Sequence, residues 1–106
     1  LILSKDFDAA EGLTTFYENL VLENLGKDCI DYGVCLLAKG IISYALGKPA
    51  NAEVCLLSAE AVFNEILEED NGYSKTTCQY LYNLYRRWQK TELAEGYKQK
   101  LLISSK

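Results

Sequence analysis

The chain of 106 residues contains no histidine and no methionine, one proline, and no apolar run near the roughly 20 residues that a membrane-spanning helix needs. Histidine is the commonest general base of enzymes, and no glycine-rich phosphate loop is present. The sequence therefore predicts a protein that is not an enzyme, binds no cofactor and has no membrane span. The absence of low-complexity tracts and a hydrophobic content of 49% indicate one folded domain over residues 1–106.

The cysteines form no C-x-x-C pair, and each lies within an apolar helical pattern: Cys29, Cys35, Cys55 and Cys78. Without histidine to complete a ligand set, no metal site is predicted, and buried free thiols are expected instead. Free thiols are typical of a reducing compartment, and the sequence shows neither a signal peptide nor an N-x-S/T acceptor. The predicted location is therefore cytoplasmic. The start Leu-Ile-Leu and the lack of methionine indicate a piece of a longer protein.

Charge is distributed unevenly along the chain. Residues 1–72 hold 13 acids against 4 bases, a net charge of −9, whereas residues 73–106 hold 2 acids against 7 bases, a net charge of +5. Such an asymmetry is typical of a surface that attracts an acidic partner. A solvated helix face without a partner is the alternative interpretation.

Apolar residues recur at helical spacing, and no segment alternates as a strand would. The predicted helices cover about residues 8–25, 28–46, 51–69, 74–90 and 92–103. Their expected N-terminal signals are the Asp8-x-x-Glu11 capping box, Asn51 and Ser74, and their expected stops include Gly26 and Gly47. Five helices joined by short turns predict an all-α fold of stacked antiparallel hairpins.

Of the predicted helices, the stretch 74–90 shows the clearest separation of an apolar face from a polar face. At 100° per residue, one arc of roughly 200° is apolar and the remainder is polar, with no mixing. The apolar arc holds Cys78, Tyr80, Leu81, Tyr82, Leu84, Tyr85 and Trp88, and the polar stripe includes the cations Lys75, Arg86, Arg87 and Lys90. An arc this wide predicts packing on two sides. The aromatic residues could also form a stacking platform for single-stranded nucleic acid, but their place on the packing arc favours the core.

The pair Ala-Glu recurs with a spacing of 42 residues, at Ala10-Glu11, Ala52-Glu53 and Ala94-Glu95, each time near the start of an expected helix. A period of this length indicates stacked helical hairpins. The small alanine side chain lets the second helix of a hairpin approach the first closely.

With this pattern the chain resembles the tetratricopeptide repeat family, in particular the long-repeat variety of kinesin light chains. The matching residues are Leu81, Tyr85, Ala94, Glu95 and Leu101 in the last hairpin, and Leu37, Ile41, Tyr44 and Ala52 in the preceding one. The chain departs from the family pattern at Gly40, where leucine is expected, and at Tyr82, where glycine or alanine is expected. The resemblance covers about residues 28–104 and implies an α-solenoid fragment.

The resemblance also implies a binding face, formed by the first helix of each hairpin. The residues expected to bind a peptide are Thr76, Gln79, Asn83, Arg86, Arg87 and Lys90 on the fourth helix and its end, and Ala38 and Ile42 on the second. Asn83 can hold a peptide backbone, and Arg86 or Arg87 can bind a carboxylate in fork geometry. The apolar strip of the second helix either accepts a hydrophobic side chain or is buried under another helix.

The leading hypothesis is a non-enzymatic module or scaffold for protein–protein interaction, which binds a short acidic and hydrophobic peptide segment. A structural domain that forms homo-oligomers is one alternative. A binder of anionic surfaces or nucleic acid through the basic C-terminal hairpin is another, which the acidic remainder of the chain disfavours.

Overall fold

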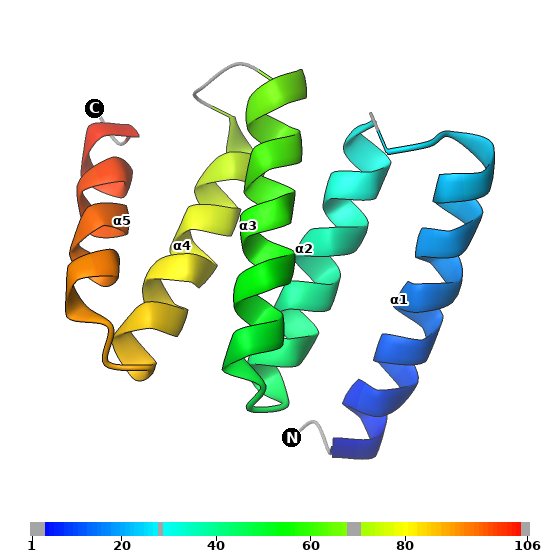
Figure 1. Cartoon of the computed structure of the whole chain (residues 1–106), viewed down its shortest axis with the longest axis horizontal. Coiled ribbons are helices and arrows are strands. Elements are labelled where there is room, and N and C mark those ends of the chain that lie inside the picture. Colours follow the sequence, from blue (N-terminus) through cyan, green and yellow to red (C-terminus); the bar gives the residue numbers. More distant parts are fainter. Residues whose placement is uncertain (1–3, 28, 68–70, 105–106) are drawn as a thin grey trace.

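The computed structural model describes residues 4–27, 29–67 and 71–104, and over these residues the chain forms five α-helices and no strand (Figure 1). The helices are α1 (Ser4–Asn24), α2 (Ile30–Ala45), α3 (Pro49–Ile66), α4 (Gly72–Arg87) and α5 (Thr91–Ser104). The all-α prediction is therefore confirmed.

The helices stand in a row that follows the order of the chain, with α1 at one end and α5 at the other (Figure 1). Each helix packs against the next, and α2 also contacts α4. Because the connections are short, neighbouring helices run antiparallel, as the hairpin interpretation predicts. Among the described residues no helix is long and apolar enough to cross a membrane.

Three of the expected helix starts are wrong by two to four residues. No proline or glycine interrupts the chain before Asp8, so α1 already begins at Ser4 and the supposed capping box lies inside it. In α3 the first turn begins with Pro49, whose fixed φ and missing N–H suit that position, so Asn51 is internal.

The start of α4 follows the same logic. Asn71 is the N-cap, because its Oδ1 accepts the backbone N–H of Ser74 at 2.8 Å, and Ser74 is therefore the third helical residue. The expected stops at Gly26 and Gly47 hold, with φ values of 81° and 75° in the left-handed region that glycine tolerates. The expected boundaries at residues 28 and 69 lie outside the described residues. Two expected helix ends are nevertheless too late, because α3 ends at Ile66, before the extended Leu67, and α4 ends at Arg87 and not at residue 90.

The core lies where α2, α3, α4 and α5 meet. Leu56 and Phe63 on α3 are fully buried there, facing two glycines of α2. A Cβ atom at Gly40 would lie 2.7 Å from Leu56, and one at Gly33 would lie 2.6 Å from Phe63. The glycine that departs from the family pattern thus has a physical reason, since a side chain at that position would force the two helices apart.

The apolar arc expected on the fourth helix is largely inward. Cys78, Leu81, Leu84 and Tyr85 are buried between the neighbouring helices. Trp88 is partly exposed because α4 ends at Arg87 and the tryptophan is its C-cap.

Candidate functional site

Seven polar residues form the outer side of α4 and its C-terminal end, which we name the α4 polar face: Lys75, Thr76, Gln79, Asn83, Arg86, Arg87 and Lys90. Asn83 is partly buried and the other six are exposed. This arrangement follows from the helical period, because the apolar residues of the same helix are directed into the stack.

Aromatic rings hold three of the cations. The guanidinium carbon of Arg87 lies 5.1 Å from the ring centroid of Tyr44 on α2, and that of Arg86 lies 5.5 Å from the ring of Tyr82. After α4 the chain turns through a left-handed residue, Gln89 with φ of 61°, and Lys90 Nζ comes to lie 3.7 Å from the ring centroid of Trp88. Such cation–π contacts restrict the cations to the vicinity of the helix end.

Two hollows lie side by side at the ends of α2 and α4. The first, of about 250 Å³, is lined by Tyr44, Asn83, Arg86 and Arg87. The second, of about 150 Å³, is lined by Tyr44, Gly47, Pro49, Leu84, Arg87 and Trp88. Tyr44 and Arg87 border both hollows. The first therefore presents amide and guanidinium groups, whereas the second has mainly apolar walls.

The structure thus brings three of the expected residues, Asn83, Arg86 and Arg87, into one hollow. Gln79 lies one turn before them and donates from Nε2 to Oδ1 of Asn83 at 3.4 Å. Thr76 lies a further turn away on the same face.

The two residues expected on α2 do not line either hollow. Ile42 is only 8% exposed and Ala38 is partly buried. The neighbouring Lys39 donates to Glu18 of α1 at 3.0 Å, so this side of α2 lies against α1. Of the expected apolar strip, Ile42 is therefore buried within the stack, whereas Ala38 remains partly exposed.

Tyr44 is a site residue that the sequence reasoning did not select. The sequence identified it only as a match to the repeat pattern, and its contact with Arg87 joins two residues that are 43 positions apart in the chain. A tyrosine in the last turn of an otherwise apolar helix could have indicated a site residue, because tyrosine often packs its ring against apolar neighbours while its hydroxyl group faces solvent.

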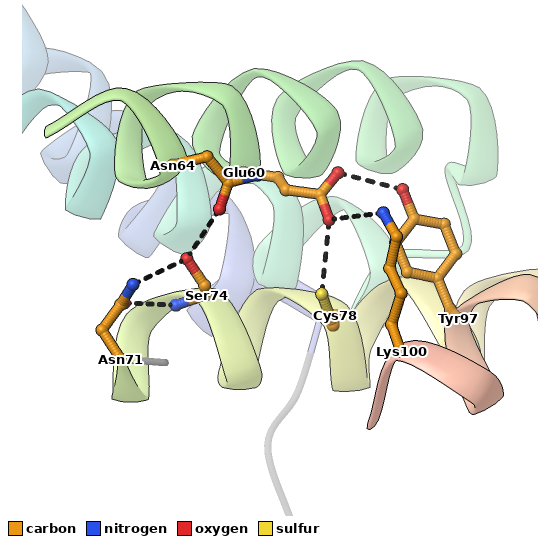
Figure 2. Close-up of polar contacts among 7 residues, drawn as sticks. All are labelled: Glu60, Asn64, Asn71, Ser74, Cys78, Tyr97 and Lys100. Carbon is orange, nitrogen blue, oxygen red and sulfur yellow. Dashed lines mark hydrogen bonds and ion pairs between the residues drawn. The ribbon is translucent and has the colours of Figure 1, made fainter. Parts of the chain in front are cut away.

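A buried carboxylate forms a second polar cluster, which Figure 2 shows. Glu60 on α3, 9% exposed, accepts hydrogen bonds from Cys78 Sγ at 3.3 Å and Tyr97 Oη at 3.0 Å. Lys100 Nζ lies 3.6 Å from the same carboxylate. One side chain of α3 therefore holds both α4 and α5.

The protonation of this cluster argues for a structural role. Burial and the hydrogen bond to Glu60 raise the pKa of Cys78 to about 12, and burial with the charge of Glu60 also raises the pKa of Tyr97. Both groups are therefore neutral donors at physiological pH, and Cys78 is a thiol, not a nucleophilic thiolate. Sequence reasoning missed Glu60, although its place among Leu56, Ala59 and Phe63 on one helix face was a usable signal.

A smaller hydrogen-bond network fixes the N-terminal end of α4 (Figure 2). Ser74 Oγ donates to Asn64 Oδ1 on α3 at 3.1 Å, and Asn71 Nδ2 donates to Ser74 Oγ at 3.1 Å. The N-cap of α4 is thereby tied to the preceding helix.

All four cysteines are free. Cys35 and Cys78 are buried, whereas Cys29 and Cys55 are partly exposed. Burial raises the pKa of Cys35 and of Cys55, so both remain thiols near neutral pH. Within the described residues no group of three or more acids and cysteines is placed to hold a metal ion.

Comparisons of the chain with protein-family models, with curated proteins and with solved structures find no match. The function is therefore inferred from the site itself.

Proposed function

We propose that this chain is a non-enzymatic protein–protein interaction module, which binds a short peptide segment carrying an acidic residue beside a hydrophobic one. The observation that supports this most directly is the pair of adjoining hollows, one lined by Asn83, Arg86 and Arg87 and the other by Leu84 and Trp88. A cationic hollow beside an apolar one matches a ligand with these two kinds of side chain.

The polar hollow provides the groups that an acidic peptide needs. Arg86 and Arg87 offer planar guanidinium groups that can bind a carboxylate through two parallel hydrogen bonds. Gln79 donates to the oxygen of Asn83, which leaves the amide NH₂ of Asn83 oriented to donate to a peptide carbonyl. Because Arg87 already rests on Tyr44, less side-chain freedom is lost on binding.

The apolar hollow provides the second half of the specificity. Its volume of about 150 Å³ suits one aliphatic or small aromatic side chain, and Pro49, Leu84 and Trp88 offer apolar walls. Since Tyr44 and Arg87 separate the two hollows, the acidic and hydrophobic residues of the ligand are adjacent or nearly so in its sequence.

A long polyanion fits this surface less well than a peptide. Residues 1–72 carry a net charge of −9, which repels a nucleic-acid backbone as it extends past the α4 polar face. A short acidic segment avoids this repulsion because it ends near the cations.

The proposal includes a tetratricopeptide-like architecture of the long-repeat variety and a cytoplasmic location. Two of the alanines in the 42-residue spacing support the first, since Ala52 is fully buried and Ala94 is 5% exposed, both in the core. Four free thiols support the second, because such thiols persist in reducing compartments.

Selection from a display library of random short peptides tests the proposal. Enriched sequences are expected to place Asp or Glu beside a large apolar residue, and Arg86→Glu is expected to weaken their binding roughly tenfold or more. The matched control is Lys98→Glu, which makes the same charge change at an exposed position of α5 and is expected to leave binding nearly unchanged. Enrichment of neutral peptides, or sub-micromolar binding of single-stranded RNA at physiological salt, would overturn the proposal.

A further inference from the structure

A stripe of four large apolar side chains lies exposed on α1. Leu13 is 69% exposed, Phe16 63%, Tyr17 49% and Leu20 40%. At 100° per residue they fall within an arc of about 100°, on the side of α1 roughly opposite Glu18, which is buried and paired with Lys39 of α2. Isolated exposed apolar residues are ordinary, but a contiguous stripe indicates an interaction surface.

Among the described side chains of α5, at the opposite end of the row, no such stripe is present. On α5, Ala94 and Tyr97 are buried, and the outward positions are mostly polar. Leu93 and Leu102 are exposed but are nine residues apart, which places them on opposite sides of the helix. A polar outer face is what the terminal helix of a stack requires. The two ends therefore do not complement each other, and a head-to-tail arrangement of copies is disfavoured.

We propose that the α1 stripe is the interface of a two-fold symmetric homodimer, in which α1 packs antiparallel against α1 of a second copy. The four residues are arranged symmetrically about the midpoint between Phe16 and Tyr17. A two-fold axis through this midpoint places Leu13 against Leu20 of the second copy and Phe16 against Tyr17. The stripe is thus self-complementary, as an isologous interface requires.

The charges on α1 are compatible with this pairing. The same axis places Glu23 against Ala10 and Glu11 against Leu22, so these carboxylates do not oppose one another. Glu18 is directed toward α2, where it is paired with Lys39 at 3.0 Å. Like-charge repulsion across the two copies is therefore small, although the helix is acidic.

The size of the stripe indicates a weak dimer. Two aromatic and two leucine side chains with these exposed fractions present on the order of 400 Å² of surface. Two copies would bury roughly twice this area, at the low end of specific interfaces. Since α1 does not contact α4 in the described structure, such a dimer leaves both α4 polar faces open. The inference does not depend on the proposed peptide function.

Sedimentation velocity over a concentration series reaching several hundred micromolar tests the interface. The wild type is expected to shift from monomer to dimer, and Phe16→Glu is expected to raise the dissociation constant roughly tenfold or more. The matched control is Val54→Glu on α3, another exposed apolar position at 64%, which is expected to associate like the wild type. Thermal unfolding confirms that both variants are folded. A wild type that stays monomeric, or an unchanged dimer in Phe16→Glu, would overturn the proposal.

Mixing two charged variants tests the antiparallel register. Leu13→Asp and Leu20→Lys are each expected to associate weakly alone, whereas their mixture restores the dimer because the opposite charges face each other. A mixture of Leu13→Asp with Leu13→Lys is the control and is expected to show no recovery. Recovery in the control alone would contradict the antiparallel pairing. A monomeric wild type that binds an added amphipathic helical peptide through this stripe would assign the surface to another partner and overturn the proposal.

Discussion

Glu60 and Arg87 occupy opposite environments. Glu60 is 9% exposed and accepts hydrogen bonds from two other helices, so its carboxylate interacts with groups inside the stack. Arg87 is exposed over the ring of Tyr44, where its donors can reach a ligand. The first residue stabilises the fold and the second belongs to the proposed binding surface.

Replacing Glu60 by alanine leaves Cys78, Tyr97 and Lys100 without their common acceptor. The expected loss in the free energy of unfolding is about 1 to 3 kcal/mol, because buried donors without a partner are costly. Urea unfolding measures it, with Glu65→Ala at an exposed position of the same helix as the control. Equal losses of stability for the two substitutions would show that the Glu60 cluster does not stabilise the fold.

Stability is expected to fall at alkaline pH. The thiol of Cys78 has an ordinary pKa of 9.0 in the unfolded chain, and its pKa in the folded chain is about 12. Between these values the folded state binds more protons than the unfolded state, so the free energy of unfolding decreases as the pH rises. For Cys78→Ala, the free energy of unfolding is expected to decrease less across this pH range than it does for the wild type. Parallel curves for the two proteins would contradict the assignment.

At the scale of the helices, the close packing of α2 on α3 depends on glycine. Gly40 lies against Leu56, and Gly33 lies against Phe63. The two contacts are one heptad apart on both helices, so each glycine provides room for a large side chain of the facing helix.

Alanine in place of Gly40 is expected to destabilise the fold by about 1 to 3 kcal/mol, because the new Cβ would meet Leu56. Gly12→Ala on α1 is the control, since no atom lies within 4 Å of its added Cβ. There the higher helix propensity of alanine is expected to stabilise by up to about 1 kcal/mol. Thermal unfolding compares the two, and a stabilising change at Gly40 would show that the helices can separate without cost.

The helices could be predicted because their apolar periodicity is strong, most clearly on α4. The N-terminal boundaries were less accurate, since several polar residues near each start could serve as the cap. The choice of Asn71 over Ser74 depends on which side chain reaches a backbone N–H, and the sequence does not contain that geometry.

Part of the candidate site could be predicted from the helical periodicity. Asn83, Arg86 and Arg87 lie on one face of one helix, so helical spacing alone groups them. Tyr44 and the covering of Ile42 depend on how neighbouring helices pack. Those features are tertiary, and the pattern of a single helix does not specify them.

At the scale of the whole molecule, charge and shape act together. The acidic helices α1 to α3 adjoin a C-terminal pair that carries the cations of the α4 polar face. Under the proposed function, this asymmetry would direct an acidic ligand toward the C-terminal end of the row. The exposed α1 stripe lies at the other end, so peptide binding and self-association can be measured separately.

An NMR titration tests the binding claim most directly. An acidic and hydrophobic peptide is added to the isotope-labelled chain, and the chemical shifts of the backbone amides are measured. The largest shifts are expected at Tyr44, Asn83, Arg86 and Arg87, with weaker perturbation when salt is raised. A peptide of the same composition in which the acids are replaced by their amides is expected to cause little change. Shifts confined to α1 or α5, or equal shifts with both peptides, would contradict the assignment of the α4 polar face as an acidic-peptide site.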